Sequence, residues 1–329
     1  MLMLVDCSSC RTPLQLTPGN RFITCAICHA ITRVADLSFY ALPSLAPSHY
    51  NQSLCSVNGR KRAVICGISY KNTRGVPKLE GCINDAKCMK HLLIKKFMFP
   101  ESSILMLTEE ETDSCRIPTK HNIRMAMFWL VQGCQPGDSL VFYYSGHGSR
   151  KRNYTNDEID EYDETLCPSD VESNGVIVDD EINATMVKPL PYGVRLHAII
   201  DACCSGTVLD LPFLCRMERN GRYAWVDHSP PSGVFKGTNG GEVISFSGCD
   251  DDQFSAETHN QSKAIATGRM TSSFIKAIES GHGTTYGDLL TSIRTIIYKD
   301  EILDGDGNRQ EPQLTANEPF DINRKQFFL

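Results

Sequence analysis

The stretch Leu196–Thr207, Leu-His-Ala-Ile-Ile-Asp-Ala-Cys-Cys-Ser-Gly-Thr, changes character abruptly at its middle. Its first half is a short apolar run, which predicts a buried parallel strand. From Asp201 onward it brings together an acid, two thiols, a hydroxyl and a glycine. Open α/β sheets bind their ligands at the carboxyl ends of their strands, so this stretch predicts polar chemistry at the edge of a sheet.

A second stretch, residues 138–149, has the same design: Asp-Ser-Leu-Val-Phe-Tyr-Tyr-Ser-Gly-His-Gly-Ser. It reads as an apolar strand that ends in His147, held between two glycines that permit sharp turns and close approach. A thiol at Cys203 and an imidazole at His147 on neighbouring strand ends can form a nucleophile and its base. The residues alone leave a redox or structural thiol open as the alternative. His197, which lies mid-strand without glycines, is interpreted as structural.

The rest of the chain after about residue 60 alternates between strand-like and helix-like segments. This alternation predicts an α/β fold with a mostly parallel central sheet flanked by helices on both faces. The expected strands are 63–70, 103–107, 139–144, 196–200 and 242–247, with an edge strand at 312–316, and the expected helices are 82–97, 120–131, 272–279 and 286–299.

Composition excludes several classes of protein. The 329 residues carry 33 basic and 39 acidic side chains, a net charge of −6 that argues against a general nucleic-acid binder. No apolar run reaches the 18 residues that a membrane span needs, and the first residues do not resemble a secretory signal. We therefore expect no membrane and no nucleic-acid partner, a location in the cytoplasm or nucleus, and few disulfides among the 15 cysteines.

The first 34 residues contain two C-x2-C pairs, Cys7 with Cys10 and Cys25 with Cys28, separated by 14 residues. Four thiolates favour a closed tetrahedral Zn²⁺ site, which has no open position for substrate and is therefore structural. The predicted domains are a zinc-ribbon prodomain at 1–34, a linker rich in proline and serine at 35–60, and a catalytic domain at 61–329.

Five motifs in the catalytic domain together resemble the metacaspases, caspase-like cysteine proteases of plants, fungi and protists. With the zinc-binding prodomain and the absence of a long insert, the chain resembles a plant type I metacaspase. The resemblance implies the caspase-hemoglobinase fold, with a large-subunit part at about 61–215 and a small-subunit part at about 230–329. The motifs are Tyr144–Ser149, Asp160–Pro168, Val178–Asn183, Asp201–Gly206 and Ser247–Gln253.

The resemblance assigns catalytic roles to individual residues. It implies that His147 is the general base and Cys203 the nucleophile, and that the N–H groups of Gly148 and Cys203 form the oxyanion hole. The chain departs from the family pattern at Cys204, where a histidine is usual, and this second thiol invites oxidation. A catalytically silent homologue that acts as a regulatory scaffold through its zinc module is the alternative.

The family cuts after Arg or Lys, which requires acids in the pocket for that side chain. The candidates are Asp85 and Asp201, with a hydroxyl from Ser145. By position alone Asp85 would be an acid that interacts with the dipole at the start of a helix; the motif around it favours substrate binding. The expected partners are protein substrates with Arg or Lys before the scissile bond, and regulatory proteins that contact the zinc module.

An acidic run at residues 157–164 suggests a further site. By itself such a run is usually a solvated loop, but the resemblance implies that it contributes to a calcium site, and carboxylate oxygens suit Ca²⁺. We expect Ca²⁺ to order the loop near the cleft and to activate the enzyme. The implied ligands are Asp163, Asp179, Asp180 and Asp210.

The polar segment 215–225 is predicted to be a flexible boundary between the two halves of the domain. It contains the candidate self-processing residues Arg216, Arg219 and Arg222, although a basic surface loop is an equal reading of them. The family resemblance further implies a zymogen that acts as a monomer in regulated cell death and stress responses.

Overall fold

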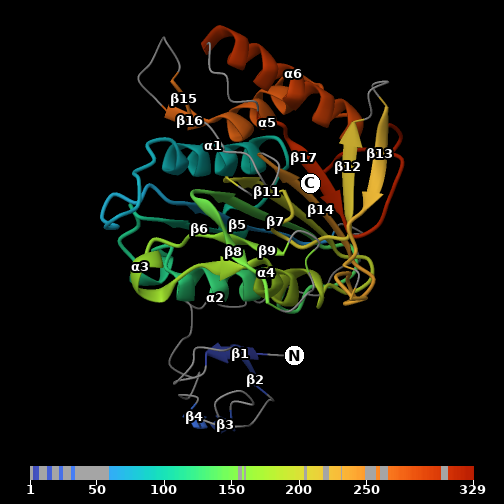
Figure 1. Ribbon diagram of the computed structural model, residues 1–329. Helices are drawn as coiled ribbons and strands as arrows, with labels where there is room; N and C mark the ends of the chain where they lie inside the picture. The colour runs from blue at the N-terminus through green and yellow to red at the C-terminus, as the bar shows by residue number, and fades with distance from the viewer. Residues whose placement is uncertain are drawn as a thin grey trace, which may run out of the picture. The chain divides into compact units, whose positions relative to one another are not determined.

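The computed structural model divides the chain into two compact units, Met1–Cys55 and Ser56–Leu329 (Figure 1). The first unit contains two antiparallel hairpins among its described residues: β1 (Met3–Asp6) with β2 (Pro13–Leu16), and β3 (Phe22–Thr24) with β4 (Ile31–Arg33). The residues that the structure describes are 3–6, 13–16, 22–24, 31–33, 59–154, 158, 161–203, 206–217, 222–230, 232–248, 257–259, 266–304 and 310–329.

An eight-stranded sheet forms the centre of the second unit, in the order β13-β12-β17-β14-β11-β7-β5-β6. The pairings from β14 through β6 are parallel, and the pairings of β17, β12 and β13 are antiparallel. The strands are β5 (Lys61–Gly67), β6 (Ile104–Thr108), β7 (Ser139–Ser145), β11 (Arg195–Asp201), β12 (Phe213–Met217), β13 (Tyr223–Asp227), β14 (Glu242–Ser247) and β17 (Gln313–Ala316).

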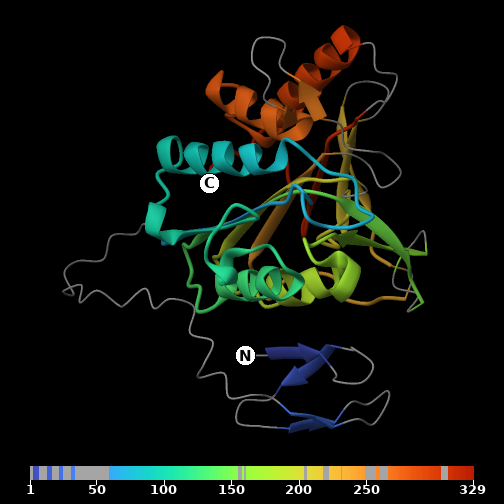
Figure 2. The same ribbon diagram turned by 90° about the vertical axis from the view of Figure 1, so that its left-hand side faces the viewer.

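Helices cover both faces of this sheet (Figures 1 and 2). One face carries α1 (Cys82–Lys95), α5 (Arg269–Glu279) and α6 (Tyr286–Asp304), and the other carries α2 (Lys120–Val131) and α4 (Asp179–Ile182) with the π-helical turn η4 (Asn183–Val187). Strand β5 shows why two cores form. Its successive side chains point to opposite faces, so Val64 and Cys66 join the core with α2, whereas Ala63 and Ile65 join the core with α1.

Smaller elements lie around the central sheet. A three-stranded antiparallel sheet, ordered β10-β9-β8, begins directly after His147. The small elements are β8 (Gly148–Arg152), β9 (Tyr162–Leu166), β10 (Ile177–Val178), the hairpin of β15 (Glu257–His259) and β16 (Ala266–Gly268), the helix α3 (Val171–Asn174), and the 3₁₀ turns η2 (Glu101–Ser103) and η3 (Ser114–Arg116).

The α/β prediction with a mostly parallel central sheet is confirmed, but two local predictions were wrong. The strand expected at an edge, β17, lies between β12 and β14, and all four of its residues are buried. The segment expected to be flexible instead contains strands β12 and β13, which form a hairpin and the outer end of the sheet. Both differences have one cause: β12 and β13 add to the sheet beside β17 and cover the edge that β17 would otherwise expose.

His197 is structural, as interpreted from its place in the strand. It is fully buried, its Nε2 lies 2.6 Å from the hydroxyl of Tyr286, and burial lowers its pKa to about 3. Its imidazole therefore stays neutral and takes part in the packing against α6. No helix in the described parts of the chain is both long and apolar enough to cross a bilayer.

Candidate active site

The carboxyl ends of β7 and β11 lie side by side. The two strands pair in parallel along their length, and the last pair in register is Ser145 with Asp201. Just beyond it, the amide of Gly146 donates a hydrogen bond to the carbonyl of Asp201 at 3.2 Å. The two polar stretches therefore leave the sheet from the same edge, as the sequence predicts.

Gly148 and Cys203 are in direct backbone contact. A Cβ built on Gly148 would lie 2.0 Å from the carbonyl oxygen of Cys203 and 3.3 Å from the Cβ of Ala202. Any side chain at position 148 would have to push this segment away, because real Cβ atoms do not approach so closely. The glycine after His147 is thus what lets the histidine segment and the thiol segment meet.

The His147 imidazole is oriented by a carbonyl group. Its Nε2 lies 2.8 Å from the carbonyl oxygen of Pro77, and a carbonyl oxygen can only accept a hydrogen bond. Nε2 therefore carries the hydrogen, and in the neutral ring Nδ1 is the basic nitrogen. The ring is partly buried and lies against the ring of Tyr70, with centroids 4.6 Å apart.

The hydroxyl of Tyr70 ties this segment to its neighbours. It accepts a hydrogen bond from the amide of His147 at 2.8 Å and donates one to the carbonyl of Cys167 at 2.5 Å. The amide of Cys167 in turn donates to the carbonyl of His147 at 3.0 Å. Burial raises the pKa of Tyr70 well above its usual value, so the hydroxyl keeps its proton. These bonds hold the histidine backbone on both sides.

Tyr70→Phe is expected to lower both stability and turnover. The change leaves a buried N–H and a buried carbonyl without this partner, which costs about 1–3 kcal/mol of unfolding free energy. Because the histidine backbone loses a restraint, kcat should fall about 10-fold or more. Urea unfolding and peptide hydrolysis measure the two effects, with Tyr192→Phe on the exposed surface as the control. An unchanged kcat would restrict Tyr70 to a role in folding.

Cys203 differs from the buried thiols of the domain. It is partly exposed, whereas Cys66, Cys167 and Cys215 are buried. Burial raises the pKa of Cys167 and of Cys215 to about 11, and raises that of Cys66 further. A buried thiol of this kind is a poor source of thiolate at neutral pH. Among the described residues at this edge, Cys203 is therefore the accessible thiol; Cys204 and Cys249 lie outside the described residues.

Two buried carboxylates, Asp85 and Asp201, converge on Gly268. A Cβ on that glycine would lie 2.2 Å from Oδ2 of Asp201 and 3.1 Å from Oδ2 of Asp85. Asp85 accepts from the amide of Gly268 at 2.9 Å and from the Ser145 hydroxyl at 3.3 Å. Asp201 accepts from the amide and the hydroxyl of Thr271, at 2.8 and 2.7 Å. The three residues predicted to bind substrate therefore lie around one point beside the catalytic edge.

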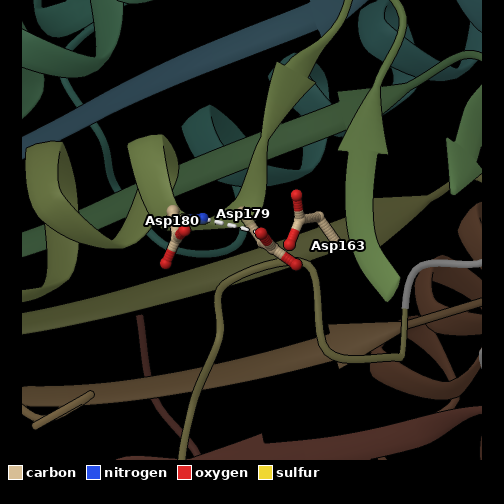
Figure 3. Close-up of side chains that lie close together, drawn as sticks. All are labelled: Asp163, Asp179 and Asp180. Carbon is tan, nitrogen blue, oxygen red and sulfur yellow. Dashed lines mark hydrogen bonds between the residues drawn. The ribbon is translucent and has the colours of Figure 1, made fainter. Parts of the chain in front are cut away.

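Three of the four predicted calcium ligands also meet (Figure 3). Asp163 comes from β9, and Asp179 and Asp180 come from the start of α4; one carboxylate oxygen of each lies within 4.8 Å of the others. Burial, followed by the charge of Asp210, raises the pKa of Asp179 well above its usual value. Crowded carboxylates on loops and element ends suit a hard divalent cation, so the donor set fits Ca²⁺.

The fourth predicted ligand, Asp210, is linked to these three aspartates by Lys236, which forms ion pairs with both Asp210 and Asp180. Its Oδ2 lies 2.5 Å from Nζ of Lys236, which also lies 3.3 Å from Oδ1 of Asp180 and 3.1 Å from Oε1 of Glu158. Burial by itself would lower the pKa of Lys236, but the carboxylates, Asp210 foremost, outweigh burial and raise it. The lysine is therefore a cation within the acidic cluster.

The remaining predicted site residues lie at the outer strands β12 and β13 or outside the described residues. Arg216 lies in β12 and Arg222 directly before β13, both exposed, so cleavage after Arg216 requires the hairpin to open. Arg219 and the zinc ligands Cys7, Cys10, Cys25 and Cys28 lie outside the described residues. In sequence, each C-x2-C pair falls between the strands of one hairpin, β1–β2 or β3–β4.

Sequence reasoning missed four contributors to these sites. The carbonyl of Pro77 and the hydroxyl of Tyr70 act through backbone contacts that carry no motif. Lys236 is a single lysine between Phe235 and Gly237, and nothing in its sequence surroundings pointed to the acidic cluster. Glu158 belongs to the acidic run that drew attention to the site, so its position could have been included on that signal.

The fold and this edge of the sheet define a class of protein: an α/β cysteine peptidase in which a thiol and an imidazole leave adjacent parallel strands. The family profile "Metacaspase, peptidase C14 domain" matches residues 61–212, and the LSD1 zinc finger profile matches residues 7–31. Metacaspase-1 of Arabidopsis thaliana is 60% identical over 99% of this chain and 96% of its own length. Metacaspase-2 of the same plant is 47% identical, over the full length of both chains.

The chain belongs to the metacaspase family and has the arrangement of the plant type I members, with a zinc finger before a caspase-like domain. The crystal structure of protein GSU0716 from Geobacter sulfurreducens matches 82% of this chain and 97% of its own, at 20% identity and a TM-score of 0.53. This likeness concerns the fold alone. The zinc finger supports the predicted Zn²⁺, and the protease family implies protein substrates.

Proposed function

We propose that this metacaspase is an endopeptidase that cuts proteins after Arg or Lys, with Cys203 as nucleophile and His147 as acid and base. The observation that carries the proposal is the backbone contact of Gly148 with Cys203 at the paired ends of β7 and β11. Such a contact would bring a thiol and an imidazole to the same peptide group. It also supports an oxyanion hole formed by the N–H groups of Gly148 and Cys203.

The reaction follows from these positions. His147 takes the thiol proton, and the Cys203 thiolate forms a C–S bond with the scissile carbonyl, whose oxygen becomes an oxyanion. His147 then donates that proton to the leaving amine as the C–N bond breaks, which leaves a thioester. Water, deprotonated by His147, attacks the thioester and releases the carboxylic acid, while the proton returns to the thiolate. The Pro77 carbonyl orients the ring throughout.

The specificity for Arg or Lys rests on the acids beside this edge. Asp85 is 1% exposed and Asp201 is 5% exposed, and two carboxylates so close together in a buried place attract a cation strongly. The guanidinium or ammonium of the substrate would be that cation, with the hydroxyl of Ser145 as an additional acceptor. A peptide with Asp before the scissile bond would add a third negative charge and should be a poor substrate.

Calcium activation is the regulatory part of the proposal. Asp163, Asp179 and Asp180 would hold the ion with Asp210, and its charge would order the segments around it. The site is connected to the catalytic segment: the amide of Glu164 donates to Asp179 at 2.7 Å, and Glu164 accepts from the hydroxyl of Thr207 at 2.6 Å. Thr207 lies four residues after Cys203, so ordering the cluster would restrain the segment that carries the thiol.

Removal of calcium is expected to abolish turnover of Arg-ended and Lys-ended fluorogenic peptides. Asp180→Asn should raise the calcium concentration for half-maximal activity about 10-fold or more, since the site loses one charged ligand. The Asp180 side chain is 41% exposed, so the fold should tolerate the change. Asp170→Asn, in a helix-capping position away from the cluster, is the control. Full activity in chelator would disprove calcium activation but leave the peptidase assignment intact.

The N-terminal module is proposed to bind one structural Zn²⁺ through Cys7, Cys10, Cys25 and Cys28, and to contact regulatory proteins. The family profile over residues 7–31 supports this. The resemblance to plant type I metacaspases also supports a role in regulated cell death and stress responses, in the cytoplasm or nucleus.

A further inference from the structure

The side chain of Lys236 occupies the acidic cluster described above. It lies in the connection between β13 and β14, and only 4% of it is exposed. Its ammonium contacts Asp210 at 2.5 Å, Glu158 at 3.1 Å and Asp180 at 3.3 Å. A buried lysine with three carboxylate partners is unusual on a surface segment, since lysines are rarely buried unless paired.

Lys236 and a calcium ion would need the same oxygen atoms. Ca²⁺ takes six to eight oxygen ligands at about 2.3–2.6 Å. Two of the oxygens it would use, on Asp180 and Asp210, already face the ammonium of Lys236. Both cations cannot lie at the centre of these oxygens at once, because their mutual repulsion would be strong in a partly buried site.

We propose that Lys236 is a built-in competitor for the calcium site, and that Glu158 is a further carboxylate of that site. In the calcium-free protein the ammonium of Lys236 holds the carboxylates together. Calcium binds only by displacing this ammonium. The inference rests on the calcium site of the proposed function and adds its regulation. Because calcium must replace the ammonium of Lys236, its affinity is lower than the carboxylates alone would give. A lowered affinity suits an enzyme that must stay inactive at low calcium concentration.

A cavity borders the acidic cluster. Its volume is about 200 Å³, and it is lined by Arg152, Asn153, Tyr154, Glu158 and Glu161. Two of these residues touch the cluster: Glu158 contacts Lys236, and the side-chain amide of Asn153 donates to Asp163. An ion in this cavity would therefore meet Glu158 and Glu161, and of these Glu158 contacts Lys236 of the cluster.

Displacement of Lys236 would also affect the segment that follows Cys203. The side-chain amide of Asn183 donates to the carbonyls of Leu209, Asp210 and Lys236, each at 3.1 Å. This one amide ties the Lys236 segment to residues 209–210. Asp210, at φ +55°, holds a backbone conformation that non-glycine residues seldom adopt and that the surrounding contacts must maintain. Movement of the lysine therefore reaches the segment that follows Cys203.

The test is calcium binding measured by titration calorimetry on the full chain carrying Cys203→Ala, which cannot cleave itself. Lys236→Met in this background should bind calcium about 10-fold or more tightly, because the competing charge is gone. Lys236→Arg keeps the charge and should bind like the parent. Lys188 is exposed, and the variant Lys188→Met controls for the change in net charge.

Thermal unfolding gives a second measurement that does not depend on activity. Without calcium, Lys236→Met should melt below the parent, because carboxylates lose their counter-ion; in saturating calcium the difference should disappear. Equal calcium affinities in the parent and Lys236→Met, or weaker binding in the variant, would overturn only the proposal that Lys236 competes with calcium. No binding in either protein would overturn it together with calcium activation, whereas peptidase activity of the Cys203-containing chain tests the catalytic assignment separately.

Discussion

Cys203→Ala is expected to lower kcat/KM for Arg-ended peptides by about 10⁴-fold or more, because removal of a covalent nucleophile eliminates the thioester route. The fold should be preserved, since Cys203 is partly exposed and its side chain is small. Hydrolysis of a fluorogenic peptide, together with the loss of labelling by a thiol-directed alkylating reagent, measures the effect. Urea unfolding checks that the variant is folded.

The neighbouring Cys204 provides the matched control. Cys204→Ala removes a thiol one residue away and should retain most of the activity in reducing buffer. It should also resist inactivation by mild oxidation if the two thiols react with each other. Loss of activity in Cys204→Ala with retention in Cys203→Ala would move the nucleophile by one residue. Absence of turnover in the parent chain itself would support the catalytically silent scaffold.

Asp85→Asn is expected to reduce kcat/KM for Arg-ended and Lys-ended peptides by about 100-fold, since loss of one partner of a buried charge pair costs about 2–5 kcal/mol. The side chain lies at the point where Asp201 and Gly268 meet, and asparagine keeps its shape. The oxygen of asparagine can still accept from the amide of Gly268, so the local fold should persist. Steady-state kinetics with peptides that differ only in the residue before the scissile bond measure the effect.

Two comparisons separate a loss of charge recognition from a general defect. Turnover of a peptide with norleucine in place of Lys should change little in Asp85→Asn, because no cation enters the pocket. Glu80→Gln makes the same change of charge at an exposed position just before α1 and should behave like the parent. An equal loss with the norleucine peptide would assign Asp85 to folding or to the catalytic geometry instead.

The strands that carry the chemistry were predicted within one residue at most of their ends. The apolar runs before Ser145 and Asp201 are short but continuous. Gly146 follows the first run directly, and a polar stretch that ends in Gly206 follows the second, so the apolar runs and the breaker residues agree. The hairpin of β12 and β13 was missed for the opposite reason. Arg216 and Met217 are exposed at the end of β12, where an exposed side chain has little energetic cost and leaves no hydrophobic pattern.

The calcium ligands illustrate the limit of motif reasoning. Asp163 and Asp179 could be named because they stand in motifs, and the structure brings their carboxylates together. Lys236 could not be named in this way. It lies in the connection between β13 and β14 and Asp210 in the connection between β11 and β12, and only the folded sheet brings these two connections together. The same holds for Pro77, whose contribution to His147 is a main-chain carbonyl that any residue would supply.

By itself, the sequence determined that two apolar strands end in a histidine between glycines and in an acid followed by thiols, because strand and turn preferences act within a few residues. Only the tertiary structure decided that Gly148 touches Cys203, that Asp85 meets Asp201, and that a lysine lies among the acids. Those contacts depend on the parallel pairing of β7 with β11 and on long connections between strands, whose closure is set by packing of the whole domain and not by local preference.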